Sequence, residues 1–447
     1  MRTGSEDMKK ALVVGLGKTG LACVRYLAAR GVEVAATDSR ERPPGLDALT
    51  AELPDVAVFL GGFDERVFAL AEDLVISPGV SLKEPVIARA MARGARVVGD
   101  IELFARAAVA PVIAITGSNG KSTVTSLVGA MAREDGRDVR VGGNLGTPAL
   151  ELLGDHEPDC YVLELSSFQL ETVYSLNARA ATVLNVSPDH MDRYGTVGDY
   201  AGAKQRIFRG DGVMVLNRDD PVVMAMAQPG RRCVRFGLAQ PADGDFGLRE
   251  HGGALWLVKG ERRLLRADEL RLQGRHNLAN VLAALALGDA AGFGWEAMLR
   301  AARRFPGLAH RTQWVAERDG VAWYNDSKGT NVGATLAAVQ GMPGPVVLIA
   351  GGLAKGADFS SLRPVLAAKA RAVVLIGRDA PQLAQALAGA VKTVAATDMD
   401  DAVARARELA RPGDSVLLSP ACASFDMFSG YEERGERFMD AVRRRLA

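Results

Sequence analysis

Short apolar runs alternate with helical patterns along almost all of the chain, and this alternation limits the folds that the chain can adopt. Strands separated by helices form βαβ units, which build parallel sheets. The alternation restarts after residues 100 and 307, so the 447 residues divide into three segments, in line with roughly 150 residues per domain. The predicted fold is therefore α/β, with three domains in series at 1–100, 101–307 and 308–447.

The apolar runs also predict where the strands of each segment lie. In the first segment, strands are expected at 10–17, 32–38, 57–62, 73–79 and 95–100. In the second, a strand, loop and helix fill 111–134, further strands are expected at 160–167 and 180–190, and a helix is expected at 277–292. The shorter runs of this segment predict hairpins at the domain edge, at 213–220, 232–237 and 254–260. In the third, strands are expected at 320–327, 345–352, 371–378, 391–397 and 415–421.

Composition and charge argue against several classes of protein. Lysine plus arginine number 54 against 53 acidic residues, without a long basic run, so nucleic-acid binding gains no support. The sequence has no run of about 18 apolar residues, so no membrane insertion is expected. Its four cysteines are scattered without a C-x-x-C pair, which favours a reducing compartment. The first apolar run contains Gly15, Gly17 and Gly20 without an evident cleavage site, which favours a β-strand over a signal peptide.

A first glycine motif, Gly15-x-Gly17-x-x-Gly20, follows the first predicted strand, and Asp38 ends the next strand. This is the context of a dinucleotide-binding fingerprint, in which glycines let the backbone approach a pyrophosphate and an acid accepts from a ribose hydroxyl. The chemistry demands only a diphosphate and a sugar. A nicotinamide cofactor, another nucleotide ligand such as a UDP-sugar, and a purely structural turn therefore all stay open.

A second glycine loop, TGSNGKST at 116–123, joins a strand to a helix. It departs from the pattern G-x-x-x-x-G-K-[ST] because Ile115 stands where the first glycine should be. Gly117 and Gly120 can still free successive amides to curl around phosphate oxygens, Lys121 supplies positive charge, and Ser122 can bind magnesium. A plain turn before a helix is the alternative, but G-K-S-T at such a junction favours a phosphate site.

Polar residues follow the next two strands. Glu164 ends one apolar run and is a candidate acid for a magnesium site, with an edge-strand carboxylate as the alternative. Asp189, His190 and Asp192 share the loop after the following strand. A histidine beside acids can be a metal ligand or a general base, and a structural histidine is the alternative.

Seven segments, in order, carry a family resemblance: TGSNGKST, ELSSFQLE, NVSPDHMDRY, GRHNLANVLAA, His310-Arg311, YNDSKGTN and LLSPACASFD. Together they span nearly the whole chain and resemble the Mur ligases, which also use the shortened glycine loop. The resemblance implies an N-terminal Rossmann-like domain that binds a uridine nucleotide, a central P-loop ATPase-like domain that binds ATP, and a C-terminal Rossmann-like domain that binds an amino acid. The first glycine motif would then hold the substrate's nucleotide and not NAD.

Within the family, the resemblance is closest to the members that use glutamate. It implies ATP-dependent addition of D-glutamate to UDP-N-acetylmuramoyl-L-alanine in cytoplasmic peptidoglycan precursor synthesis. ATP would convert the substrate carboxylate to an acyl phosphate, and the glutamate amine would attack it through a tetrahedral intermediate. Because two anions meet in the first step, charge neutralisation and positioning should dominate catalysis. The implied cofactors are ATP and Mg²⁺, and the implied state is a monomer.

The same resemblance assigns site residues position by position. The implied ATP site comprises Gly117, Ser118, Asn119, Gly120, Lys121, Ser122, Thr123, Asn277, Asn280, Arg311 and Asp326. The implied UDP-substrate site comprises Gly17, Lys18, Thr19, Asp38, Ser39, Arg40, Ser77, Gly79, Asn144 and His190. The implied metal ligands are Ser122, Glu164, His190 and Lys204, and the implied catalytic residues are Lys121, His190 and Lys204. Lys204 matches a lysine that the family carries as a carbamate, whereas the residues alone predict a solvated helix lysine.

The implied amino-acid site comprises Thr330, Lys355, Ser424, Phe425 and Tyr431. A cation with hydroxyl donors suits a dicarboxylic amino acid. Phe425 stands where leucine or tryptophan is usual and Tyr431 where phenylalanine is common, so L-glutamate or another amino acid stays open. An NAD-dependent oxidoreductase, which has no need of the second glycine loop, and a nucleotide-gated binding module without chemistry are the alternatives from other classes.

Overall fold

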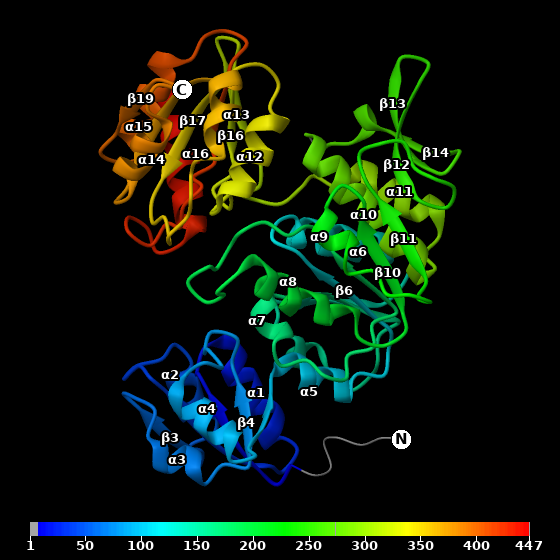
Figure 1. Ribbon diagram of the computed structural model, residues 1–447, viewed down its shortest axis with the longest axis vertical. Helices are drawn as coiled ribbons and strands as arrows, with labels where there is room; N and C mark the ends of the chain where they lie inside the picture. The colour runs from blue at the N-terminus through cyan, green and yellow to red at the C-terminus, as the bar shows by residue number, and fades with distance from the viewer. Residues whose placement is uncertain (1–7, 273, 447) are drawn as a thin grey trace.

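The computed structural model describes residues 8–272 and 274–446, which form three α/β units in series (Figure 1). In Figure 1 the first unit is blue, the central unit runs from cyan to green, and the third runs from yellow to red. The α/β fold class with three domains is confirmed. The exact boundaries at 1–100, 101–307 and 308–447 stay predictions, and residues 1–7 and 447 lie outside the described residues.

The first unit holds a five-stranded parallel sheet in the order β3-β2-β1-β4-β5. This is the Rossmann strand order, and ligands bind where the order reverses, here between β1 and β4. All five predicted strands are confirmed: β1 (Lys10–Val14), β2 (Glu33–Asp38), β3 (Ala57–Leu60), β4 (Asp73–Ile76) and β5 (Arg96–Val98). The helices are α1 (Lys18–Ala28), α2 (Leu46–Glu52), α3 (Glu65–Ala69), α4 (Pro85–Ala92) and α5 (Asp100–Ala107).

The central unit holds a nine-stranded sheet in the order β14-β13-β12-β11-β10-β9-β6-β8-β7. Strand β6, which lies between β9 and β8, is buried throughout and leads into the second glycine loop. The strands are β6 (Val112–Thr116), β7 (Val139–Gly143), β8 (Cys160–Glu164), β9 (Ala180–Val183), β10 (Val213–Asn217), β11 (Cys233–Phe236), β12 (Phe246–His251), β13 (Ala254–Lys259) and β14 (Arg262–Arg266). The α-helices are α6 (Lys121–Glu134), α7 (Ser167–Leu170), α8 (Val197–Gln205), α9 (Pro221–Met224), α10 (Arg275–Ala291) and α11 (Trp295–Arg304).

The hairpins predicted at 213–220 and 232–237 are wrong. β10 pairs in parallel with both β9 and β11, and α9 lies on the connection between β10 and β11. The first four residues of β10 are buried, as expected of a strand inside a parallel sheet. The antiparallel part of the sheet consists of β12, β13 and β14. Of these three strands, only β13 was predicted, as the run at 254–260.

The third unit holds a six-stranded sheet in the order β15-β16-β20-β17-β18-β19. The five predicted strands are confirmed, and the polar edge strand β15 adds an antiparallel sixth. The strands are β15 (Gln313–Arg318), β16 (Val321–Asn325), β17 (Val346–Gly351), β18 (Ala370–Ile376), β19 (Thr393–Ala395) and β20 (Ser415–Leu418). The helices are α12 (Val332–Gly341), α13 (Leu362–Lys369), α14 (Ala380–Leu387), α15 (Met399–Leu409) and α16 (Tyr431–Leu446).

Two features of the helices matter for the site. α10 is buried along most of its length, because its alanines let it pack closely against α6 behind the glycine loop. Among the helices in the described ranges, none has both the length and the apolar character needed to cross a bilayer.

Candidate active site

A first cavity of about 440 Å³ lies at the carboxyl end of the first sheet. It is lined by the loops after β1, β2 and β4, together with Gly143 at the end of β7 in the central unit and Asn144 after it. The structure brings these predicted UDP-substrate residues together around the cavity: Gly17, Lys18, Thr19, Asp38, Ser39, Arg40, Ser77, Gly79 and Asn144. His190, also predicted for this site, does not line it.

Asp38 is a fixed anion at the edge of this cavity. Its Oδ2 accepts a hydrogen bond from the Leu16 N–H at 2.7 Å, and its two oxygens bind the Arg40 guanidinium at 2.8 and 2.7 Å. Burial opposes ionisation of this carboxyl, but the hydrogen bonds from Arg40 and Leu16 outweigh it and lower the pKa of Asp38. Asp38 is thus an ionised acceptor, as the glycine fingerprint requires.

A second cavity of about 700 Å³ lies between the central and third units. The glycine loop, the start of α10 and the loops around Arg311 and Asp326 line it. The predicted ATP-site residues that line it are Asn119, Gly120, Thr123, Asn277, Asn280, Arg311 and Asp326. The remaining predicted ATP-site residues lie in the same loop without lining the cavity: Gly117, Ser118, Lys121 and Ser122.

The glycine loop needs both of its glycines. Gly120 caps α6 at φ 85°, and a Cβ there would lie 2.4 Å from Oδ1 of Asn280. Gly117 has φ 153°, and a Cβ there would lie 3.0 Å from Cβ of Leu184. The loop therefore packs tightly against α10 and the end of β9, and it opens onto the N-terminus of α6, where backbone N–H groups favour an anion.

Two lysines donate to one carbonyl of this loop. Nζ of Lys121 lies 2.8 Å from the Gly117 oxygen and 3.0 Å from the Ser118 oxygen, and Nζ of Lys204 lies 2.9 Å from the same Gly117 oxygen. Lys204 is only 1% exposed, so the solvated lysine predicted from the residues alone is wrong. Burial lowers the pKa of Lys121, and burial together with the charge of Lys121 lowers the pKa of Lys204 well below its usual value.

Glu164 contributes an unsatisfied anionic oxygen near these lysines. It is 3% exposed, and its Oε1 accepts a hydrogen bond from Nδ2 of Asn144 at 2.8 Å. Its Oε2 is buried without a hydrogen-bond partner among the described residues. Its charge acts on both Lys121 and Lys204. A buried orphan carboxylate oxygen of this kind fits a cation.

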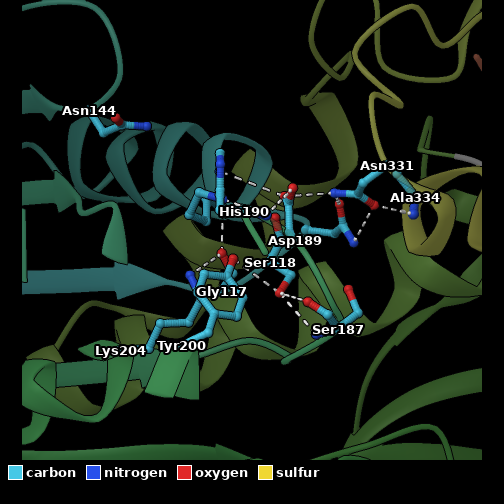
Figure 2. A network of polar contacts seen from close by, with 12 residues as sticks. Gly117, Ser118, Asn144, Ser187, Asp189, His190, Tyr200, Lys204, Asn331 and Ala334 are labelled. Carbon is cyan, nitrogen blue, oxygen red and sulfur yellow. Dashed lines mark hydrogen bonds and ion pairs between the residues drawn. The ribbon is translucent and has the colours of Figure 1, made fainter. Parts of the chain in front are cut away.

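The loop that carries His190 is bound to the glycine loop (Figure 2). Ser118 Oγ donates to the Ser187 carbonyl and accepts from the Ser187 N–H, both at 3.0 Å. His190 itself has φ 56° and lies with its Nε2 3.8 Å from Oδ2 of Asp189. Burial lowers the pKa of His190 although Asp189 opposes the shift, so the imidazole is neutral near pH 7 and able to bind a metal ion or accept a proton.

The third unit reaches the same loops. Arg311 Nη2 donates to Ser122 Oγ at 2.7 Å. Asn331 caps α12 by accepting from the Ala334 N–H at 2.8 Å, and its Nδ2 donates to Asp189 at 3.1 Å and to Asn119 at 3.3 Å (Figure 2). The glycine loop, the His190 loop and the third unit therefore form one polar network.

The predicted amino-acid residues lie in neighbouring loops of the third unit. Thr330, Lys355 and Ser424 follow β16, β17 and β20, which are adjacent in the sheet, while Tyr431 starts α16. Ser424 is buried, whereas Phe425 is 68% exposed. None of these five lines either cavity, and their roles stay predictions.

Several residues that form contacts around the two cavities were not predicted as site residues. They are Gln169, Asn185, Tyr200, Asn331 and Arg193. All except Tyr200 lie inside the motifs that carry the family resemblance. Their position within these motifs could have marked them as site residues. Their contacts could not be predicted, because these depend on the tertiary structure.

Comparisons with known proteins agree with this architecture. Family models match in order: Mur ligase MurD-like, N-terminal domain, at 9–99; Mur ligase middle domain at 115–288; and Mur ligase, glutamate ligase domain, at 310–422. A curated relative named UDP-N-acetylmuramoylalanine–D-glutamate ligase from Nitrosococcus oceani is 59% identical over 439 residues, covering 98% of this chain and 97% of the relative. A relative of the same name from Marinobacter nauticus is 57% identical over 437 residues, covering 97% and 98%. Among solved structures, the MurF ligase of Thermotoga maritima in complex with ADP has a TM-score of 0.61 at 16% identity, covering 99% of this chain and 97% of that one, which is a likeness of fold.

Gly120→Ala should weaken nucleotide binding in the second cavity by about tenfold or more, because left-handed strain alone amounts to about 1–2 kcal/mol and the new methyl group would also strike Asn280. Gly202→Ala, at an exposed position of α8 with nothing within 4 Å of the added Cβ, is the matched control. Calorimetric titration with ADP measures both variants. Equal ADP affinity in the two would show that the loop does not hold the nucleotide.

Proposed function

The chain belongs to the Mur ligase family, and we propose that it joins D-glutamate to UDP-N-acetylmuramoyl-L-alanine with conversion of ATP to ADP and phosphate. The observation that carries the proposal is the Asn144–Glu164 hydrogen bond. Asn144 lines the cavity of the first sheet, whereas the charge of Glu164 acts on Lys121 of the glycine loop and on Lys204 of α8. We infer that a carboxylate held at the first site meets a phosphate held at the second near this contact.

The reaction has two steps that this site suits. A carboxylate oxygen of the muramoyl-alanine attacks the γ-phosphorus of ATP, and the bond from that phosphorus to ADP breaks, giving an acyl phosphate. The glutamate amine then attacks the acyl carbon, loses a proton and expels phosphate, so an amide bond forms. Lys121 and Arg311 bring positive charge to the first step, in which two anions must approach each other.

The donor set fits magnesium. Ser122 Oγ and the unpartnered Oε2 of Glu164 would hold one ion together with nucleotide phosphate oxygens and water, which is how Mg²⁺ is usually bound. His190 and Lys204 would contribute to a second. When bound, the ions would neutralise phosphate charge and orient the γ-phosphoryl group.

The proposal includes a carbamate on Lys204. A carbamate forms when a neutral amine attacks the carbon of carbon dioxide and loses a proton, so burial that lowers the pKa of Lys204 favours it. The product would replace a buried cation by an anion able to bind a metal ion, beside Tyr200, whose ring lies 4.4 Å from Nζ.

For the amino acid, we propose D-glutamate held by Thr330, Lys355 and Ser424, which provide one ammonium group and two hydroxyls for its two carboxylates. The proposal also takes the enzyme to be a monomer, as the family resemblance implies, and to act in the cytoplasm, since it consumes ATP and a nucleotide-linked precursor.

Phosphate release from ATP should require both UDP-N-acetylmuramoyl-L-alanine and D-glutamate. The measurement adds amino acids one at a time, L-glutamate included, at fixed ATP and magnesium. Phosphate release in the absence of an amino acid would refute the ligase proposal, and so would no phosphate release with any amino acid. A preference for L-glutamate would refute the stereochemical part of the proposal.

Lys121→Ala tests whether the ATP site and the UDP-substrate site bind their ligands independently. It should abolish turnover because it removes a cation from the glycine loop, while binding of the UDP-substrate to the first unit should persist in calorimetry. If this variant instead loses the UDP-substrate, the division of labour between the two cavities is wrong.

Protein equilibrated with ¹³C-bicarbonate should give a carbamate carbonyl signal in ¹³C NMR. The signal should disappear in Lys204→Met, which keeps the length of the side chain without its amine. Its presence in that variant would assign the carbamate to another amine, and its absence in the unaltered protein would contradict the modification.

A further inference from the structure

Arg193 belongs to the His190 loop of the central unit, yet its side chain reaches the first unit. Its Nη1 donates to the carbonyl of Pro78 at 2.8 Å, and its Nη2 lies 3.2 Å from the carbonyl of Val80. These residues form the turn after β4, which is closed by a hydrogen bond from the Val80 N–H to the Ser77 carbonyl at 2.9 Å. The turn lines the cavity of the first sheet, whereas Arg193 does not line it.

The central unit holds the same guanidinium from the other side. Nη2 lies 2.6 Å from Oε2 of Glu171, and the guanidinium carbon lies 4.1 Å from the centre of the Phe168 ring. The Arg193 side chain is only 13% exposed, and that of Glu171 is 17% exposed. Both partners come from α7 or the residue after it, which lies on the side of the central unit facing the first unit (Figure 1). A second hydrogen bond between the two units runs in the opposite direction: Nζ of Lys83, in the first unit, donates to the Arg193 carbonyl at 3.2 Å.

Phe168 also connects Arg193 to His190 within the His190 loop. Its ring meets the His190 ring edge to face, with centres 4.8 Å apart, and it stacks on Tyr194 at 5.9 Å. One guanidinium therefore joins the turn of the first cavity to the ring that packs against His190. A lysine cannot replace it, because only the planar fork of arginine binds two carbonyls and a carboxylate while stacking on a ring.

We propose that Arg193 is a positioning residue for the UDP-substrate: although it belongs to the ATP-binding unit, it fixes the turn 77–80 and so sets the affinity of the first cavity. This inference rests on the proposed function for the identity of the ligand, but the contact between the two units exists independently of it. Arg193 acts through the turn without touching the substrate, so its loss changes one binding site and leaves the other as it was.

Arg193→Lys tests the inference by calorimetric titration of the full chain with UDP-N-acetylmuramoyl-L-alanine and, separately, with ADP. We expect the affinity for the UDP-substrate to fall by about tenfold, the usual effect of losing one charge-assisted hydrogen bond, with ADP affinity unchanged. Arg209→Lys is the matched control, because Arg209 also donates to a carbonyl and lies over an aromatic ring, but only within the central unit. Glu171→Gln should shift affinity in the same direction by less, since both carbonyl contacts remain.

Hydrogen exchange distinguishes failure of this inference from failure of the proposed function. In Arg193→Lys without ligand, peptides covering residues 77–80 should exchange faster than in the unaltered protein, while peptides of the glycine loop should not. Unchanged exchange at 77–80 with unchanged UDP-substrate affinity would overturn the role of Arg193. Equal losses of UDP-substrate and ADP affinity would overturn it too, because they indicate general destabilisation. If the unaltered protein does not bind the UDP-substrate, the proposed function fails, and the exchange result still decides whether Arg193 holds the turn.

Discussion

Two buried lysines that share one backbone carbonyl are the constraint on which the rest of the site depends. Lys121 and Lys204 both donate to the Gly117 oxygen, and neither forms an ion pair within 8–272 and 274–446. Bringing two amines out of water lowers the pKa of each, and their mutual repulsion adds to this effect for Lys204. Such an arrangement is suited to added negative charge: phosphate groups supply it at Lys121 when ATP activates a carboxylate, and the proposed carbamate supplies it on Lys204 itself.

Side chains of the central and third units connect the two cavities to this part of the molecule. Asn144 connects the first cavity to Glu164, Arg311 connects the third unit to Ser122, and Asn331 connects α12 to Asp189. Asn144 follows the parallel strand β7 and Asn331 caps α12, which are positions where α/β folds place their ligands, whereas Arg311 comes from the segment before β15. The sheets thus supply rigid supports, and the chemistry lies in the short segments between them.

The sequence predicts the parallel strands and the glycine loop well, because β1 and β6 are continuous apolar runs followed by glycines at fixed spacing. It does not predict that β10 and β11 pair in parallel, since short apolar runs look alike in hairpins and in buried sheets. It also misses the burial of Lys204 and the reach of Arg193 into the first unit, because both depend on contacts between residues far apart in the chain. The family resemblance implies a role for Lys204, whereas local patterning alone indicates a solvent-exposed side chain. The NAD interpretation of the first glycine motif had a similar cause: the motif specifies a diphosphate and a sugar, and only the rest of the chain indicates which nucleotide.

The central claim is that phosphate is transferred to a substrate carboxylate before the amide bond forms. Substrate labelled with ¹⁸O at both oxygens of the alanyl carboxylate tests it directly. If an acyl phosphate forms, one labelled oxygen leaves with the phosphate and the other stays in the amide, so mass spectrometry of the released phosphate should detect one ¹⁸O per turnover. Released phosphate without label would contradict the account, because ATP would then have been cleaved by water and not by the carboxylate.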